Sequence, residues 1–421
     1  MSFGASFLGG ANSRLLPVSI PLRFFLLGLV FQAAGWAVLL TNAADLAGFN
    51  GGLGPVLAAV HLLTLGVLTM TAMGASYQFL PIVTRQALMR FWPARLSFWL
   101  VAAGVIILAY AMARLWPFGL DLGAGLVAAG LLIFVILTGD NLRRASGVPV
   151  VAAHGWLALV ALSAVVIAGF LLISDFRSGG LGDHQAVAIF HMVLAIFGFM
   201  GLFAVGFSYI LVPMFALAHV DISRAAWAQF LLSVFAIIGF LLGVQTHRGP
   251  LMIASASAGF IAAAIYIWAM WTSLRAGMRK RLGVSFLLIR VSWGFLLVGV
   301  FLGGAMVANV PVPNTPALFG FVVLVGWLLT FLMGVLQRIM PFLASMHITD
   351  KTGKPPLLSS LTPKRPLLVH AAFHFLAVGL VSVGIVVNSA ILIRFGAASG
   401  LVAVAAFAVF SGHILVQLRK R

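Results

Sequence analysis

Twelve long apolar runs divide this sequence, and they constrain its fold more than any other feature. A helix needs about 20 predominantly apolar residues to cross a bilayer, and only 8% of this chain is charged, against roughly a quarter of a soluble domain. We therefore expect residues 1–421 to form a single all-α membrane domain. The expected spans are 20–42, 54–83, 94–113, 117–138, 149–173, 186–214, 225–244, 250–275, 283–307, 315–344, 366–388 and 390–418.

The basic residues predict the orientation of the chain. Short cytoplasmic loops carry an excess of Lys and Arg. If the N-terminus lies inside, 21 of the 25 basic residues face the cytoplasm, and the exceptions are Arg114, Arg177, Arg248 and Arg394. The net charge of +18 is then a topology signal beside lipid headgroups, and we expect no nucleic-acid partner. These features indicate a multi-pass protein of a bacterial or archaeal inner membrane with both termini in the cytoplasm.

Three of the expected spans share a pattern of residues. In each, a Gly stands 15 and 7 residues before a Pro, which ends the span, and these prolines are Pro81, Pro213 and Pro341. Successive prolines are 132 and 128 residues apart. This spacing predicts three four-helix repeats, at about 15–145, 146–281 and 282–421. Because four is even, the repeats should be related by a pseudo-threefold axis along the membrane normal.

Histidine carries most of the cofactor chemistry that this chain can offer. The chain has no Cys, which excludes disulfides, iron–sulfur clusters and thiolate ligation of haem. Ionisable groups inside a membrane are candidates for function, but all seven acidic residues are Asp in loops or at span ends. His61, His191 and His374 remain as the deep candidates. We expect four other histidines to contact water at helix ends or in loops: His154, His219, His247 and His347.

His61 and His191 lie at nearly equivalent points of two repeats. They stand 20 and 22 residues before their prolines, and the third repeat has Phe319 and Phe321 there. At 1.5 Å per residue, both should lie about 10 Å below the outer surface. Their helix faces are apolar with small residues, which suits a flat macrocycle. The pair is therefore a candidate for haem ligation, although each His could instead only bond a neighbouring helix.

Other residues are candidates for secondary roles at such a site. His184 shares the face of His191 at the outer boundary, where it could meet a haem propionate, a metal ion or water. Outside cations able to pair with haem carboxylates are Arg177, Arg248 and Arg114. His370 and His374 are four residues apart and could share one metal ion. For that pair, hydrogen bonding at a cytoplasmic helix end is the favoured interpretation.

The second span resembles the haem-bearing tenth helix of subunit I of the haem–copper oxidases, particularly of the cbb3 type. That helix carries H-x-H followed by a Gly-Ala-x-Tyr-x-x-x-Pro ending, and this chain has His61 and then Gly74-Ala-Ser-Tyr77-Gln-Phe-Leu-Pro81. The family also has twelve helices in three four-helix arcs. The resemblance implies that His61 matches the low-spin haem ligand, whereas Ala59 stands at the position of the high-spin haem ligand.

Departures from the family pattern limit the activity that the resemblance implies. Span seven has no adjacent His pair, and span ten has no His, so we expect neither the copper centre nor reduction of oxygen or nitric oxide. The absence of Glu argues against the family's usual proton channels. If span two takes the place of the tenth helix and span six that of the second, His61 and His191 become the axial ligands of one low-spin haem b. His370 and His374 would then fall on the helix that matches the copper-bearing seventh.

These expectations describe a haem-binding b-type cytochrome with a fold like that of haem–copper oxidase subunit I. It would serve electron transport in a respiratory chain or bind a gas, as an oxidoreductase component rather than a terminal oxidase. Haem b is the expected cofactor and copper the less favoured one. One alternative is a transporter or a metal- or cofactor-handling membrane protein, and another is a non-catalytic subunit of a respiratory complex. Expected partners are the lipid bilayer, a redox partner or other membrane subunits, and a second copy of the chain.

Overall fold

The computed structural model describes residues 15–88, 90–279, 282–348 and 356–419. Within these residues the fold is all-helical, and 12 helices are long and apolar enough to cross a membrane. The predicted spans are thereby confirmed, each to within five residues at either end. Some of the predicted cytoplasmic basic residues lie outside the described residues: Arg14, Lys280, Arg281, Lys351, Lys354, Lys420 and Arg421.

Nine of the spans are continuous α-helices. They are α2 (Ser19–Thr41), α5 (Trp92–Arg114), α6 (Pro117–Arg143), α7 (Pro149–Ser178), α10 (Ser223–Gln245), α11 (Gly249–Ala276), α12 (Gly283–Val307), α15 (Lys364–Val386) and α16 (Ala390–Arg419). A short 3₁₀ helix, η2 (Ala43–Asp45), follows α2. Several of these helices begin with Pro in their first turn, where the missing N–H leaves no hydrogen bond unmade.

The other three spans each contain a π-helical segment between two α-helices. They are α3 (Pro55–His61), η3 (Leu62–Thr69) and α4 (Met70–Val83); α8 (His184–Val193), η4 (Leu194–Gly201) and α9 (Leu202–Ala216); and α13 (Thr315–Phe321), η5 (Val322–Leu329) and α14 (Thr330–His347). The π-helical segments begin 132 and 128 residues apart, the same separations as the three prolines. The pseudo-threefold axis itself stays a prediction.

The expectation that the repeated prolines end their spans is wrong. Pro81, Pro213 and Pro341 lie inside α4, α9 and α14, and the last helix continues to His347. A proline removes one backbone hydrogen bond, and in a bundle of packed helices the neighbours and local adjustments of the backbone compensate for it.

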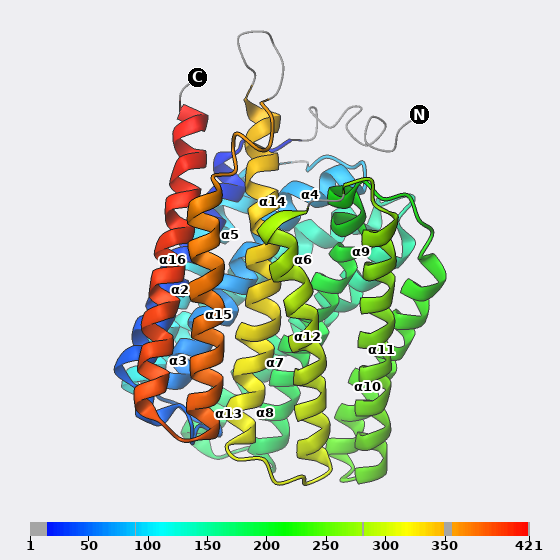
Figure 1. The fold of residues 1–421 in the computed structure, drawn as a ribbon. Helices are drawn as coiled ribbons and strands as arrows, with labels where there is room; N and C mark the ends of the chain where they lie inside the picture. The colour runs from blue at the N-terminus through cyan, green and yellow to red at the C-terminus, as the bar shows by residue number, and fades with distance from the viewer. Residues whose placement is uncertain (1–14, 89, 280–281, 349–355, 420–421) are drawn as a thin grey trace.

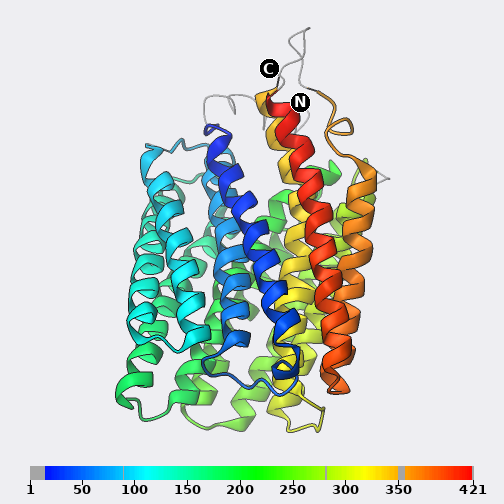
Figure 2. The same ribbon diagram turned by 90° about the vertical axis from the view of Figure 1, so that its left-hand side faces the viewer.

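The helices form one bundle in which they run roughly along a common direction (Figures 1 and 2). The start of α2 and the end of α16 lie at the same end of the bundle, side by side, and we call this end the terminal face. The π-containing span α13–η5–α14 lies at the centre, because 89% of its most apolar stretch is buried, against 17% for α10. The spans that carry the repeated pattern therefore form much of the core.

Small residues allow adjacent helices to approach closely. A Cβ atom at Gly104 of α5 would lie 2.7 Å from the backbone nitrogen of Val127 on α6, and one at Gly123 would lie 2.6 Å from that of Leu108. Without a hydrophobic driving force between helices in lipid, such close packing is a main source of helix association. The α5–α6 hairpin depends on these two glycines.

Candidate functional site

The fold brings His61 and His191 together. His61 is the last residue of α3, directly before the π-helical segment η3, and His191 lies in α8, shortly before η4. Their ring centroids are 6.4 Å apart and their planes differ by 26°. Because α3 and α8 lie at the end of the bundle away from the terminal face (Figure 1), the two rings lie in that half of the molecule.

Hydrogen bonds to the backbone fix the tautomer of both rings. His61 Nδ1 lies 3.0 Å from the carbonyl oxygen of Leu57, and His191 Nδ1 lies 3.0 Å from that of Val165. A carbonyl oxygen only accepts, so each Nδ1 carries the proton and donates it. Each Nε2 is then an unprotonated nitrogen, and neither has a hydrogen-bond partner in the part of the chain that the structure describes. Metal-ligating histidines have this arrangement.

The separation of the two rings fits a single metal ion between them. With metal–nitrogen bonds of about 2.0–2.1 Å, two imidazoles on opposite sides of one ion place their ring centroids roughly 6.4 Å apart. The observed distance is 6.4 Å. The centroid separation therefore matches that of two imidazoles bound to one metal ion. Both residues are only partly buried in the protein.

A glycine of α7 lies next to the His191 ring. A Cβ atom at Gly169 of α7 would lie 3.4 Å from Cε1 of His191, so the glycine lets that ring lie against α7. Six residues beyond His191, Phe197 contacts two aromatic rings of the third π-containing span, Trp327 at 5.9 Å and Phe319 at 6.4 Å between centroids. Phe319 is one of the two residues that stand in the third repeat where the first two repeats have His61 and His191. The third π-containing span therefore contributes aromatic side chains to the packing around Phe197.

Two of the outer polar candidates, His184 and Arg177, have partners of their own. His184 Nδ1 lies 2.7 Å from Asp175 Oδ2, and Arg177 Nη2 donates to Asp121 Oδ1 at 2.7 Å. Arg248 precedes the first residue of α11 and is exposed. Nothing in these contacts brings the three residues to the His61–His191 pair, and their role at haem propionates stays a prediction.

His370 and His374 form a second pair, deep inside the bundle. Both are completely buried on α15, with ring centroids 5.7 Å apart and planes 19° apart. His370 Nδ1 donates to the carbonyl oxygen of Ala403, and His374 Nε2 lies 2.7 Å from Thr330 Oγ1. Because the Thr330 hydroxyl donates to the Val325 carbonyl, His374 donates to Thr330.

The remaining nitrogen of each ring in this second pair has no partner. His370 Nε2 and His374 Nδ1 are buried and make no hydrogen bond. Unpartnered buried polar atoms are costly and call for an explanation such as a bound ion or water. The predicted hydrogen bonds at this site are present, but they involve only one of the two nitrogens of each ring.

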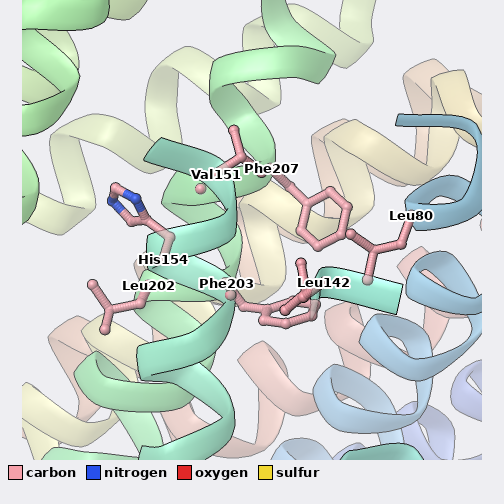
Figure 3. A pocket seen from close by; sticks show the side chains of 9 residues that line it. Leu80, Leu142, Val151, His154, Leu202, Phe203 and Phe207 are labelled. Atoms are coloured by element: carbon pink, nitrogen blue, oxygen red, sulfur yellow. The ribbon is translucent and has the colours of Figure 1, made fainter. Parts of the chain in front are cut away.

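The prediction that His154 contacts water is wrong. His154 is completely buried on α7, with Nδ1 2.8 Å from the Val150 carbonyl oxygen and Nε2 2.9 Å from Gln229 Oε1. Gly206, the repeated glycine of α9, gives it room, because a Cβ atom there would lie 2.6 Å from His154 Cβ. Figure 3 shows the His154 ring turned away from Leu80 and Phe207, which line the adjacent apolar hollow. The repeated glycine at position 206 was the sequence signal of close helix packing at this point.

The other histidines differ from the two pairs in their contacts. His347 lies 2.9 Å from the carbonyl oxygen of Leu343 through Nδ1 and 3.1 Å from that of Leu16 through Nε2, so both of its nitrogens are occupied. His219 and His247 are exposed, as predicted. Among the described residues, no group of three or more His, Cys, Asp or Glu side chains is placed to hold a metal ion.

Comparisons with known proteins do not add to these observations. No protein-family model matches the chain, and no curated protein matches it.

Proposed function

We propose that this multi-pass membrane protein is a b-type cytochrome in which His61 and His191 hold one haem through their Nε2 atoms. The observation that supports this most is the pair of unprotonated Nε2 atoms on rings whose centroids are 6.4 Å apart. The resemblance of the second span to the haem-bearing helix of haem–copper oxidases points to the same residue, His61. Haem supplies one-electron chemistry when it is bound.

The protein's own groups would orient the two ligands. The carbonyl oxygens of Leu57 and Val165 accept from Nδ1 of His61 and His191 and so hold each ring at a fixed angle. A hydrogen bond of this kind also raises the basicity of the opposite nitrogen as a ligand. If both histidines held the iron, no position would remain for a gas molecule, which favours electron transfer over gas binding. The bilayer orientation that we infer from the positive-inside rule puts the terminal face in the cytoplasm and the pair in the outer half.

A spectrum of the purified protein tests this proposal. We expect a Soret band, and a pyridine haemochrome assay that reports haem b at about one per chain. His61→Ala and His191→Ala should each remove most of the haem. His347→Ala is the matched control, because both nitrogens of His347 already face carbonyl oxygens, and it should keep the haem. A protein without haem after expression in a haem-sufficient host, or haem retained in both variants, would rule the proposal out.

A second candidate function is the handling of a metal ion at His370 and His374. It is favoured by the two buried, unpartnered nitrogens of this pair. Imidazole ligands suit copper, as well as zinc, iron and nickel. If this function holds, purified protein retains copper in metal analysis, and His370→Ala with His374→Ala loses it while the haem content stays unchanged. Copper without haem would favour this alternative, and co-purifying subunits would favour a structural role in a respiratory complex.

A further inference from the structure

Two arginines converge on one tryptophan at the terminal face of the bundle. Arg275 lies in the last turn of α11 and Arg290 lies in the second turn of α12. The guanidinium carbons are 5.6 Å and 5.4 Å from the centroid of the Trp271 ring. Cations within about 6 Å of such a ring are attracted to its face, so Trp271 holds both charges in one place.

This cluster faces the lipid. Trp271 is 41% exposed, and both arginines are exposed. Large apolar side chains on α12 are also exposed at the spacing of one helix face, at Leu287 and Phe301. Arg290 is seven residues beyond the first residue of α12, about 10 Å along the helix axis. A cation at that depth on a lipid-facing surface extends towards the headgroups.

The arginines have no acidic partner within the described part of the chain. Its ion pairs join Arg143 and Arg144 to Asp140, Arg177 to Asp121, and His184 to Asp175. On the neighbouring α9–α10 connection, the Asp221 carboxylate accepts from the backbone N–H of Ser223. Two like charges beside one aromatic ring repel each other, and an anion between or beside them offsets this repulsion.

We propose that Arg275, Arg290 and Trp271 bind the phosphate of an anionic phospholipid in the leaflet at the terminal face. Guanidinium groups bind phosphate oxygens in a bidentate manner, and Trp is enriched at the membrane–water interface. Basic sites between transmembrane helices on the cytoplasmic side recognise anionic headgroups. A phospholipid fits this location better than a soluble anion, because the surface around the cluster is apolar and exposed. The site does not depend on the haem proposal.

Native mass spectrometry of delipidated protein tests this site with two probes, phosphatidylglycerol and phosphatidylcholine. We expect the wild-type protein to bind phosphatidylglycerol more tightly. The double variant Arg275→Gln/Arg290→Gln should bind it roughly 30-fold more weakly, since each basic residue near an anionic surface contributes about a factor of five. The control is Arg394→Gln, which removes an exposed charge at the opposite face and should not change the affinity.

Three results would overturn the phospholipid site. They are equal affinity of the wild type for the two lipids, an equal loss of affinity in the control, and displacement of phosphatidylglycerol by millimolar inorganic phosphate, which would indicate a soluble anion. The comparison of the two lipids on the wild type needs no variant, so it decides the question even if the double variant does not fold. Haem content, measured on the same samples, should be unaffected in either variant.

Discussion

His61 and His191 lie on two different π-containing spans, and their rings are 6.4 Å apart with Nδ1 of each bonded to a backbone carbonyl. The bond of His61 is local, to Leu57 one turn earlier on α3, whereas that of His191 reaches Val165 on α7. The fold sets the separation of the rings, and the carbonyls of Leu57 and Val165 set their tautomer. Both conditions are needed for two nitrogens to face one metal ion.

The size of the residue at position 169 determines how much space remains next to the His191 ring. A Cβ atom at this position would lie 3.4 Å from His191 Cε1, which is ordinary van der Waals contact. We therefore expect Gly169→Ala to keep its haem and Gly169→Leu to lose most of it, because a branched side chain would push the ring out of line. The haem-to-protein ratio of the two purified variants measures this. Equal haem in both would show that the ring does not occupy its observed position.

Gly104 is expected to be essential for the contact between α5 and α6. A Cβ atom there would lie 2.7 Å from the backbone nitrogen of Val127, which cannot move aside as a side chain can. Gly104→Ala should destabilise the protein by about 1–3 kcal/mol, the usual cost of overpacking. Gly125→Ala on α6 is the control, since nothing lies within 4 Å of its added Cβ. Thermal melting in detergent compares them, and similar melting temperatures would contradict the close packing.

Gln229 links two buried side chains. Its Oε1 accepts from the Tyr209 hydroxyl at 3.0 Å and lies 2.9 Å from His154 Nε2. Gln229→Leu leaves both groups without this partner, at a cost of about 1–3 kcal/mol for each. Tyr209→Phe removes one donor together with its hydroxyl and should cost about 1 kcal/mol. Melting temperatures in detergent should therefore fall further for Gln229→Leu, and the reverse order would mean that Gln229 does not hold the network together.

The absence of Cys makes the membrane orientation directly measurable. Arg144→Cys introduces a thiol at the terminal face, and Gly182→Cys introduces one on the exposed connection before α8 at the opposite face. If the terminal face is cytoplasmic, a membrane-impermeant maleimide labels Gly182→Cys in intact cells and Arg144→Cys only after permeabilisation. The opposite pattern would invert the topology that the basic residues predict.

Hydropathy was sufficient to predict the twelve spans, because every helix must satisfy its backbone hydrogen bonds internally and present apolar side chains to lipid. Deviations at the ends, such as α6 continuing to Arg143, reflect helices that extend beyond the apolar core. The repeated Gly and Pro positions identified the three π-containing spans but not their π-helical turns. Those turns depend on tertiary packing, which a residue pattern does not encode.

The candidate site was predictable only in part. Matched distances from the prolines singled out His61 and His191, but the carbonyls of Leu57 and Val165 have no sequence signal, since every residue has one. The prediction that His154 contacts water was wrong because His154 lies near the start of α7, where an isolated helix would be exposed to water. In the bundle, α9 and α10 cover that end of α7 through Gly206 and Gln229. Burial at a helix end is decided by the neighbours of the helix.

The most direct test of the bis-histidine haem is the electron paramagnetic resonance spectrum of the oxidised, purified protein. We expect a low-spin ferric signal, and a rhombic one, because the two ring planes differ by only 26°. His61→Ala and His191→Ala should each abolish that low-spin signal, while His347→Ala should preserve it. A protein without haem, or a low-spin signal that survives in both single variants, would contradict the assignment of His61 and His191 as the ligands.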